Sequence, residues 1–168
     1  TRAIHGAQPP DELTGAVNVP IYLSSTFVQE SPGVHKGYEY SRTSNPTRSA
    51  YEKCIAGLEN GRFGYSFASG LAAVATVMHL VKAGEHVVAC DDFYAGSFRL
   101  FDSVLQDHGL LFSYVDLLDP DALVGAITPA TKLVWIETPT NPLLKVFDIE
   151  AIANIVHENG LLLAVDNT

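Results

Sequence analysis

The chain has 168 residues, of which 47% are hydrophobic and 17% are charged, a composition typical of one globular domain and not of a disordered segment. Its formal net charge of -9 argues against a general nucleic-acid-binding surface, so any anion site must be local. The sequence has no apolar run long enough to cross a membrane and no signal-peptide pattern, so we expect a cytoplasmic protein without a membrane partner. The histidines show no ligand spacing, which predicts no metal site, and the spacing of Cys54 and Cys90 favours reduced thiols.

Residues 1–44 contain many turn-forming residues and little helical periodicity. A stretch this long without regular structure is unusual inside a compact domain, so we expect an N-terminal arm that contacts a neighbouring subunit. Tyr40 and Arg42 lie two residues apart, on one side of an extended segment, where a phenol and a guanidinium can hold a phosphate. For this pair alone, an arginine stacked on a surface tyrosine is the simpler interpretation.

A helix is predicted from Pro46, with Asn45 as its cap, to a stop at residues 60–61. A short strand-like run over residues 64–67 then turns at Ser69 and Gly70 into a second helix. Free backbone N–H groups at such a helix start make a seat for a phosphate, although the same dipeptide caps many helices that bind nothing.

Residues 86–90 read as a buried strand, and Tyr94 follows at its carboxyl end, where the ring can either stack on a flat ligand or pack over the sheet. The apolar residues 98, 101 and 105 predict the inner face of a helix that ends before Gly109. A strand over 110–115 and a short helix near 121–126 come next.

The strand 133–136 ends in Glu137, and Asn141 follows between two prolines. This asparagine can donate to a ring hydroxyl or a substrate carboxylate, or simply close a turn. Asp148 is predicted to cap a last helix that ends at residues 159–160.

The final strand, residues 161–165, reads as buried on both faces and presents Asp166 at its carboxyl end. That carboxylate can hold a proton on a cofactor's ring nitrogen, or it can cap a following turn.

Four strands that alternate with helices predict an α/β fold, a mostly parallel sheet with helices on both faces. The polar outliers all fall at the same sheet edge, which offers a helix terminus for phosphate, an aromatic ring for stacking and a carboxylate for a ring nitrogen. Pyridoxal 5′-phosphate fits this description. Its enzymes hold it as a Schiff base with a lysine, yet the lysines are expected at positions away from this edge, namely Lys36, Lys53, Lys82, Lys132 and Lys145. We therefore expect no catalytic residue in this portion and place the lysine beyond Thr168.

Here the sequence resembles the cysteine/methionine-metabolism pyridoxal enzymes, which include cystathionine γ-lyase and γ-synthase. The similarity runs through nearly the whole chain. Its motifs are Ile4-His5-Gly6, Thr14-Gly15-Ala16-Val17, Pro20-Ile21-Tyr22, Tyr38-Glu39-Tyr40-Ser41-Arg42, Asn45-Pro46-Thr47, Phe67-Ala68-Ser69-Gly70-Leu71-Ala72, Glu137-Thr138-Pro139-Thr140-Asn141-Pro142 and Val165-Asp166-Asn167-Thr168. The resemblance implies fold type I with residues 45–168 as the front part of the large domain, a homotetramer of dimers with shared active sites, and γ-elimination or γ-replacement on a small amino acid in transsulfuration.

The resemblance also implies roles for individual residues. Gly70 and Leu71, beside Ser69, look like the phosphate donors, while Tyr40 and Arg42 look like the pair that reaches the phosphate of a neighbouring subunit.

The remaining matched residues belong to the ring and the substrate. Tyr94 resembles the stacking residue, Asp166 the partner of the ring nitrogen, and Asn141 a ligand of the cofactor hydroxyl or substrate carboxylate. Glu137 and Thr168 match positions that line the pocket, and Tyr94 and Glu137 are expected beside the substrate.

Several alternatives stay open. Within the family, cystathionine β-lyase and methionine γ-lyase are alternatives, although Gly96 stands where methionine γ-lyases carry a cysteine. Outside the family, the alternative hypothesis is that the chain is a non-catalytic, lysine-less assembly or regulatory fragment. A Rossmann-type nucleotide binder has the right layers, but the glycine fingerprint is missing.

Overall fold

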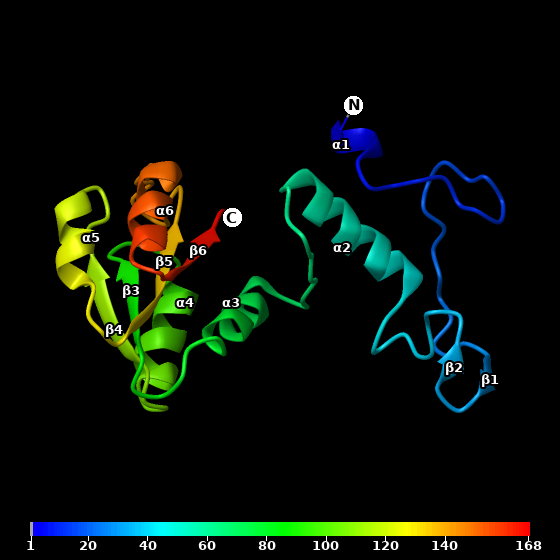
Figure 1. Cartoon of the computed structure of the whole chain (residues 1–168), viewed down its shortest axis with the longest axis horizontal. Helices are drawn as coiled ribbons and strands as arrows, with labels where there is room; N and C mark the ends of the chain where they lie inside the picture. Colours follow the sequence, from blue (N-terminus) through cyan, green and yellow to red (C-terminus); the bar gives the residue numbers. More distant parts are fainter. Residues whose placement is uncertain (1) are drawn as a thin grey trace. The chain divides into compact units, whose positions relative to one another are not determined.

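The computed structural model describes residues 2–168 and divides the chain into two compact units, residues 1–67 and 68–168 (Figure 1). This boundary differs from the predicted end of the arm at residue 44, because the helix α2 (Pro46–Leu58) falls in the first unit. The contact of residues 1–44 with a neighbouring subunit stays a prediction. No helix in the described part of the chain is long and apolar enough to span a membrane.

The first unit contains little regular structure apart from α2. A short helix, α1 (Arg2–His5), and a small antiparallel hairpin of β1 (Gln29–Ser31) and β2 (Val34–His35) precede it. Asn45 caps α2 as predicted, since its Oδ1 accepts a hydrogen bond from the N–H of Thr47 at 2.8 Å.

The strand expected over residues 64–67 is wrong. This segment lies against α2: the Glu52 carboxylate accepts hydrogen bonds from the N–H and the hydroxyl of Ser66 at 3.0 and 2.8 Å. A side chain at Gly64 would come within 2.2 Å of the Glu52 carbonyl oxygen, so the two backbones touch there. Contact with a helix has replaced pairing with a strand.

The second unit is built on a four-stranded parallel sheet in the order β4-β3-β5-β6, which confirms the predicted architecture. Its strands are β3 (His86–Cys90), β4 (Leu111–Val115), β5 (Thr131–Glu137) and β6 (Leu162–Asp166). β3 and most of β5 are buried, because they occupy the middle of the sheet. Their carboxyl ends therefore open at one common edge.

Helices connect these strands. The helix α3 (Gly70–Met78) leads into the sheet, and α4 (Ala95–Leu100) continues into one π-helical turn, η1 (Phe101–Leu105), between β3 and β4. The helices α5 (Pro120–Ala126) and α6 (Ile149–Glu158) complete the connections. Right-handed crossovers place α4 on one face of the sheet and α5 and α6 on the other, as Figure 1 shows. Phe101 packs on Phe112 and Trp135, with ring centroids 5.0 and 5.6 Å apart, which fixes α4 and η1 to their face.

The last strand differs from the expectation of burial on both faces. β6 forms the edge of the sheet, and Leu162 and Val165 keep 50% and 37% of their surface exposed. The apolar run predicted a central strand, but position in the sheet decides burial, and only β5 covers one side of β6.

Candidate functional site

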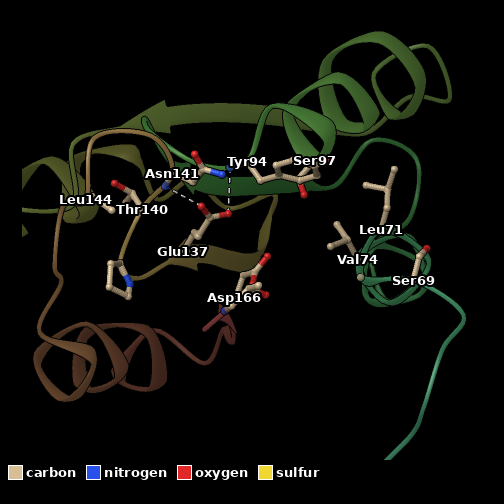
Figure 2. Close-up of a pocket in the computed structure, with 13 residues that line it drawn as sticks. Ser69, Leu71, Val74, Tyr94, Ser97, Glu137, Thr140, Asn141, Leu144 and Asp166 are labelled. Atoms are coloured by element: carbon tan, nitrogen blue, oxygen red, sulfur yellow. Dashed lines mark hydrogen bonds between the residues drawn. The ribbon is translucent and has the colours of Figure 1, made fainter.

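A cavity of about 660 Å³ opens at the carboxyl edge of the sheet, between the strand ends and the N-terminus of α3 (Figure 2). Its size is that of a small-molecule site. All of its lining residues belong to the second unit: Ser69, Gly70, Leu71, Val74, Tyr94, Ser97, Glu137, Pro139, Thr140, Asn141, Leu144, Asp166 and Thr168. The cavity thus brings together every predicted site residue except Tyr40 and Arg42.

Glu137 ties two loops of the cavity together. It is the last residue of β5 and is 5% exposed; its Oε2 accepts from the N–H of Tyr94 at 2.9 Å and its Oε1 from the N–H of Asn141 at 2.8 Å. Burial raises the pKa of the Glu137 carboxyl above its ordinary value, and the nearby Asp166 and Asp92 carboxylates add to the rise, whereas the two N–H groups oppose it. The buried carboxylate therefore fixes the position of the two residues that flank it.

Asp166 ends β6, directly beside Glu137 in the sheet register. Its Oδ1 accepts from the N–H and the hydroxyl of Thr168 at 3.1 and 2.6 Å, so the turn-capping interpretation of this residue holds. Its other oxygen, Oδ2, has no hydrogen-bond partner among the described residues and lines the cavity together with the rest of the side chain. One carboxylate thus caps a turn and remains able to bind a cation.

Tyr94 precedes α4 and leaves about half of its side chain exposed at the cavity wall. Its ring lies over Gly96: a Cβ built on Gly96 would come 2.3 Å from Cε1 of Tyr94. The ring can lie this close to the helix backbone only because residue 96 has no side chain. The exposed face of the ring is free to stack on a flat ligand.

The start of α3 forms another wall. Ser69 caps the helix, because its hydroxyl oxygen accepts from the N–H of Ala72 at 3.1 Å. The N–H groups of Gly70 and Leu71 make no hydrogen bond within the described residues, and a side chain at Gly70 would meet nothing within 4 Å. These two donors stand open at the positive end of the helix dipole, the arrangement that accepts a phosphate.

Asn141 lies on a loop that a second buried carboxylate supports. Asp92 is 8% exposed and accepts from the hydroxyl of Thr140 and, at 3.0 Å, from the N–H of Leu143. Sequence reasoning missed Asp92, and the only signal was an acid placed directly after a buried strand. The loop is therefore fixed at both ends, while the side-chain amide of Asn141 makes no hydrogen bond with the described residues.

Lys145 corrects one expectation, since it does lie at the carboxyl edge of the sheet. Its Nζ is 2.9 Å from both carboxylate oxygens of Asp91 and 3.1 Å from Asp116. The hydrogen bond to Asp91 raises the pKa of Lys145, which favours its charged form. A lysine engaged by two carboxylates and absent from the cavity wall is not available as a nucleophile.

Tyr40 and Arg42 belong to the first unit, where both are exposed. The Arg42 guanidinium carbon lies 5.0 Å from the centroid of the Tyr40 ring, so the stacked arrangement that was the simpler interpretation is the one observed. Their role toward a phosphate stays a prediction.

Ser97 is a cavity residue that sequence reasoning missed. It lies in the first turn of α4 and is 1% exposed, and its hydroxyl has no hydrogen-bond partner in the part of the chain that the structure describes. Only a count along the helix from Tyr94 could have drawn attention to it.

Metal and thiol chemistry find no support in the described part of the chain. No group of three or more histidine, cysteine, aspartate or glutamate side chains there is placed to hold a metal ion. Both cysteines are free, and burial raises the pKa of the Cys90 thiol to about 12, which keeps it protonated and unreactive.

The residues of the cavity fit a phosphorylated, protonatable ring. Gly70 and Leu71 offer two open N–H donors, Tyr94 offers an aromatic face, and Asp166 offers a free carboxylate oxygen. A buried hydroxyl without a partner, that of Ser97, adds one more polar atom that a ligand can satisfy.

Comparisons with known proteins agree with this chemistry. The chain matches the Cys/Met metabolism PLP-dependent enzyme family over residues 1–168. It is 53% identical to the cystathionine beta-lyase of Coxiella burnetii and 53% identical to the probable cystathionine gamma-synthase of Herpetosiphon aurantiacus, covering 100% of this chain and 44% and 53% of those relatives. The solved structure of cystathionine gamma-lyase from Lactobacillus plantarum, complexed with L-serine, has a TM-score of 0.94 and 51% identity over 99% of this chain and 44% of that one.

The chain spans about half the length of the curated relatives that it matches. The similarity covers the arm as well as the sheet, and the fold of the solved structure is the fold described above. The chain therefore belongs to the Cys/Met metabolism PLP-dependent enzyme family, whose cofactor is pyridoxal phosphate.

Proposed function

We propose that the complete protein is a cystathionine γ-lyase or γ-synthase and that residues 68–168 form the cofactor side of its active site. The observation that carries the proposal is the cavity that joins Asp166, the Tyr94 ring and the open N–H groups of Gly70 and Leu71. Bound pyridoxal phosphate supplies a protonated ring that withdraws electrons from the α-carbon of an amino acid.

Each residue of the cavity has a definite task in this proposal. The Gly70 and Leu71 N–H groups hold the phosphate, and Tyr94 keeps the ring in place by stacking. The free oxygen of Asp166 keeps a proton on the ring nitrogen, because a negative charge next to that atom favours its charged form. Asn141 donates its side-chain amide to the ring hydroxyl or the substrate carboxylate.

Glu137 is proposed to act indirectly, by holding two other residues in place. Its two hydrogen bonds, 2.9 and 2.8 Å long, fix the N–H of Tyr94 and the N–H of Asn141, so the stacking ring and the amide are placed by one carboxylate. It therefore lines the substrate side of the cavity mainly as a positioning residue.

The catalytic lysine is proposed to come from outside residues 1–168. None of the lysines in the described chain lines the cavity, and Lys145, the one located at this edge, is bound to Asp91 and Asp116. The exposed first unit, with Tyr40 and Arg42, is proposed to contact a neighbouring subunit of a homotetramer and to offer this pair to its phosphate. A cytoplasmic location is part of the same proposal.

The test is carried out in the complete protein with Asp166→Asn. This variant removes the negative charge but keeps an oxygen that can accept from Thr168, so folding is retained. We expect the rate at which cystathionine is cleaved or formed to fall by about 100-fold or more, the size of effect seen when one electrostatic group of an active site is removed. The bound cofactor's absorption spectrum should also change, because the ring nitrogen loses its partner.

Asp148→Asn is the matched control, since Asp148 caps α6 on the surface and asparagine caps helices equally well. Near-normal turnover in Asp166→Asn would contradict the role of this carboxylate. The thiol product separates the activities: cleavage at the γ carbon releases cysteine, and cleavage at the β carbon releases homocysteine. Release of homocysteine alone would replace the γ assignment by a β-lyase.

A further inference from the structure

Among the described residues, three side chains have a buried polar atom without a hydrogen-bond partner, namely Ser97, Tyr114 and Trp135, and of these Ser97 alone lines the cavity. Its hydroxyl is buried, with the residue 1% exposed, and no atom of the described residues accepts its hydrogen or donates to its oxygen. Buried hydroxyls without a partner are rare in folded proteins, because each one loses its hydrogen bonds to water and gains none in return.

The surroundings of Ser97 explain why its hydroxyl stays unpaired. Leu71 and Val74 of α3 line the same part of the cavity and offer no acceptor through their side chains (Figure 2). The Glu137 carboxylate accepts hydrogen bonds from two backbone N–H groups and makes none with Ser97. In the empty cavity an alanine would suit this place better than a serine.

The position of Ser97 gives the hydroxyl a use. It lies on the helix turn that begins at Tyr94, and Figure 2 shows its oxygen directed into the space between Tyr94, Asp166 and α3. That space is the one assigned to the phosphorylated ring. A ligand with acceptor oxygens would supply the hydrogen-bond partner that the protein withholds.

We infer that Ser97 is a cofactor-binding residue whose hydroxyl donates a hydrogen bond to an oxygen of bound pyridoxal phosphate. The inference rests on the proposed function and adds a contact that the sequence analysis did not assign. The inference predicts opposite effects of the hydroxyl in two states: it should lower the stability of the protein without cofactor and raise the stability of the protein with cofactor bound.

The experiment compares Ser97→Ala with the wild type of the complete protein, stripped of cofactor and titrated with pyridoxal phosphate. We expect the dissociation constant of the variant for pyridoxal phosphate to be about tenfold larger, which corresponds to the loss of one good hydrogen bond. In the absence of cofactor, the thermal midpoint of Ser97→Ala should equal or exceed that of the wild type, because the variant removes an unsatisfied group.

Two further variants make the result specific. Ser97→Thr keeps the hydroxyl and should recover most of the affinity, whereas Ser103→Ala, an exposed serine in the next helical turn, should change neither quantity. Equal affinity of Ser97→Ala and wild type would overturn the inference while leaving the proposed function intact. A wild-type protein that fails to bind the cofactor would overturn both.

Discussion

The two units of the molecule bury their apolar side chains to very different degrees. In the described chain, every buried apolar residue lies in the second unit, between Val74 and Val156. In the first unit α2 has no buried residue, and Leu13, Leu23 and Val28 are at least 90% exposed. Burial of apolar surface is the main stabilising term in folding. The second unit therefore carries its own core, whereas the first unit leaves its large apolar side chains exposed; that these side chains pack on a partner stays a prediction.

The sharpest way to break this comparison is to remove one large apolar side chain from each unit. Phe101→Ala should lower the free energy of unfolding of the complete protein by about 3–5 kcal/mol, because Phe101 is fully buried against Phe112 and Trp135. In a subunit separated from any partner, Leu23→Ala should change it by no more than about 0.5 kcal/mol, because Leu23 is 92% exposed in the single chain. Urea unfolding measures both.

A measurement of assembly tests whether another subunit covers the exposed apolar side chains of the first unit. If the first unit packs on another subunit, Leu23→Asp should shift sedimentation toward smaller species and leave the secondary structure of the second unit unchanged. Equal loss of structure in Phe101→Ala and Leu23→Asp would show that the two units share one core, and the contrast between them would have to be abandoned.

The next effect in size concerns the polar interior of the second unit. Glu137→Ala should cost about 2 kcal/mol, since it leaves the partly buried N–H groups of Tyr94 and Asn141 without their acceptor. Glu137→Gln retains one acceptor and should cost less. The control is Glu150→Ala on the exposed start of α6. If Glu137→Ala unfolds at the same urea concentration as the control, the two loops are held by other contacts.

The smallest effect is a pH dependence at the opposite end of the sheet. His86 lies between Thr131 and Ser113, with its ring nitrogens 2.8 and 3.0 Å from their hydroxyl oxygens, and burial lowers its pKa below the ordinary value. The unfolded chain then binds the proton more readily, so stability is fully present above about pH 6.5 and falls as the pH drops through and below that value.

This dependence belongs to the second unit alone. The unfolding free energy of His86→Gln should therefore fall less steeply between pH 7.5 and pH 5.5 than that of the wild type. Urea titrations at several pH values check this. An unchanged slope in the variant would show that other groups govern the acid sensitivity of the fold.

Local signals predicted most of the helices and strands of the chain. Asn45 and Asp148 cap their helices as expected, and the strands after residues 85 and 130 were found from short apolar runs. The rule that parallel strands end at one edge then predicted that Tyr94, Glu137 and Asp166 meet in one cavity.

Non-local packing decided what the sequence could not show. The run at residues 64–67 has the composition of a strand, yet it lies against Glu52 of α2, and the last apolar strand is an edge. Asp92 supports the Asn141 loop by accepting a hydrogen bond from the hydroxyl of Thr140, which lies 48 positions away in the sequence. The unpaired state of Ser97 depends on what surrounds it in space, which no local pattern encodes.

The absence of a side chain at Gly96 allows the Tyr94 ring to lie where it does. Because a Cβ there would come within 2.3 Å of Cε1 of Tyr94, a side chain at residue 96 requires the ring to leave its present position. The residue at position 96 thus influences the orientation of the Tyr94 ring, which forms part of the cavity wall. A lineage that acquires a side chain at this position changes the shape offered to the substrate without replacing any residue that touches it.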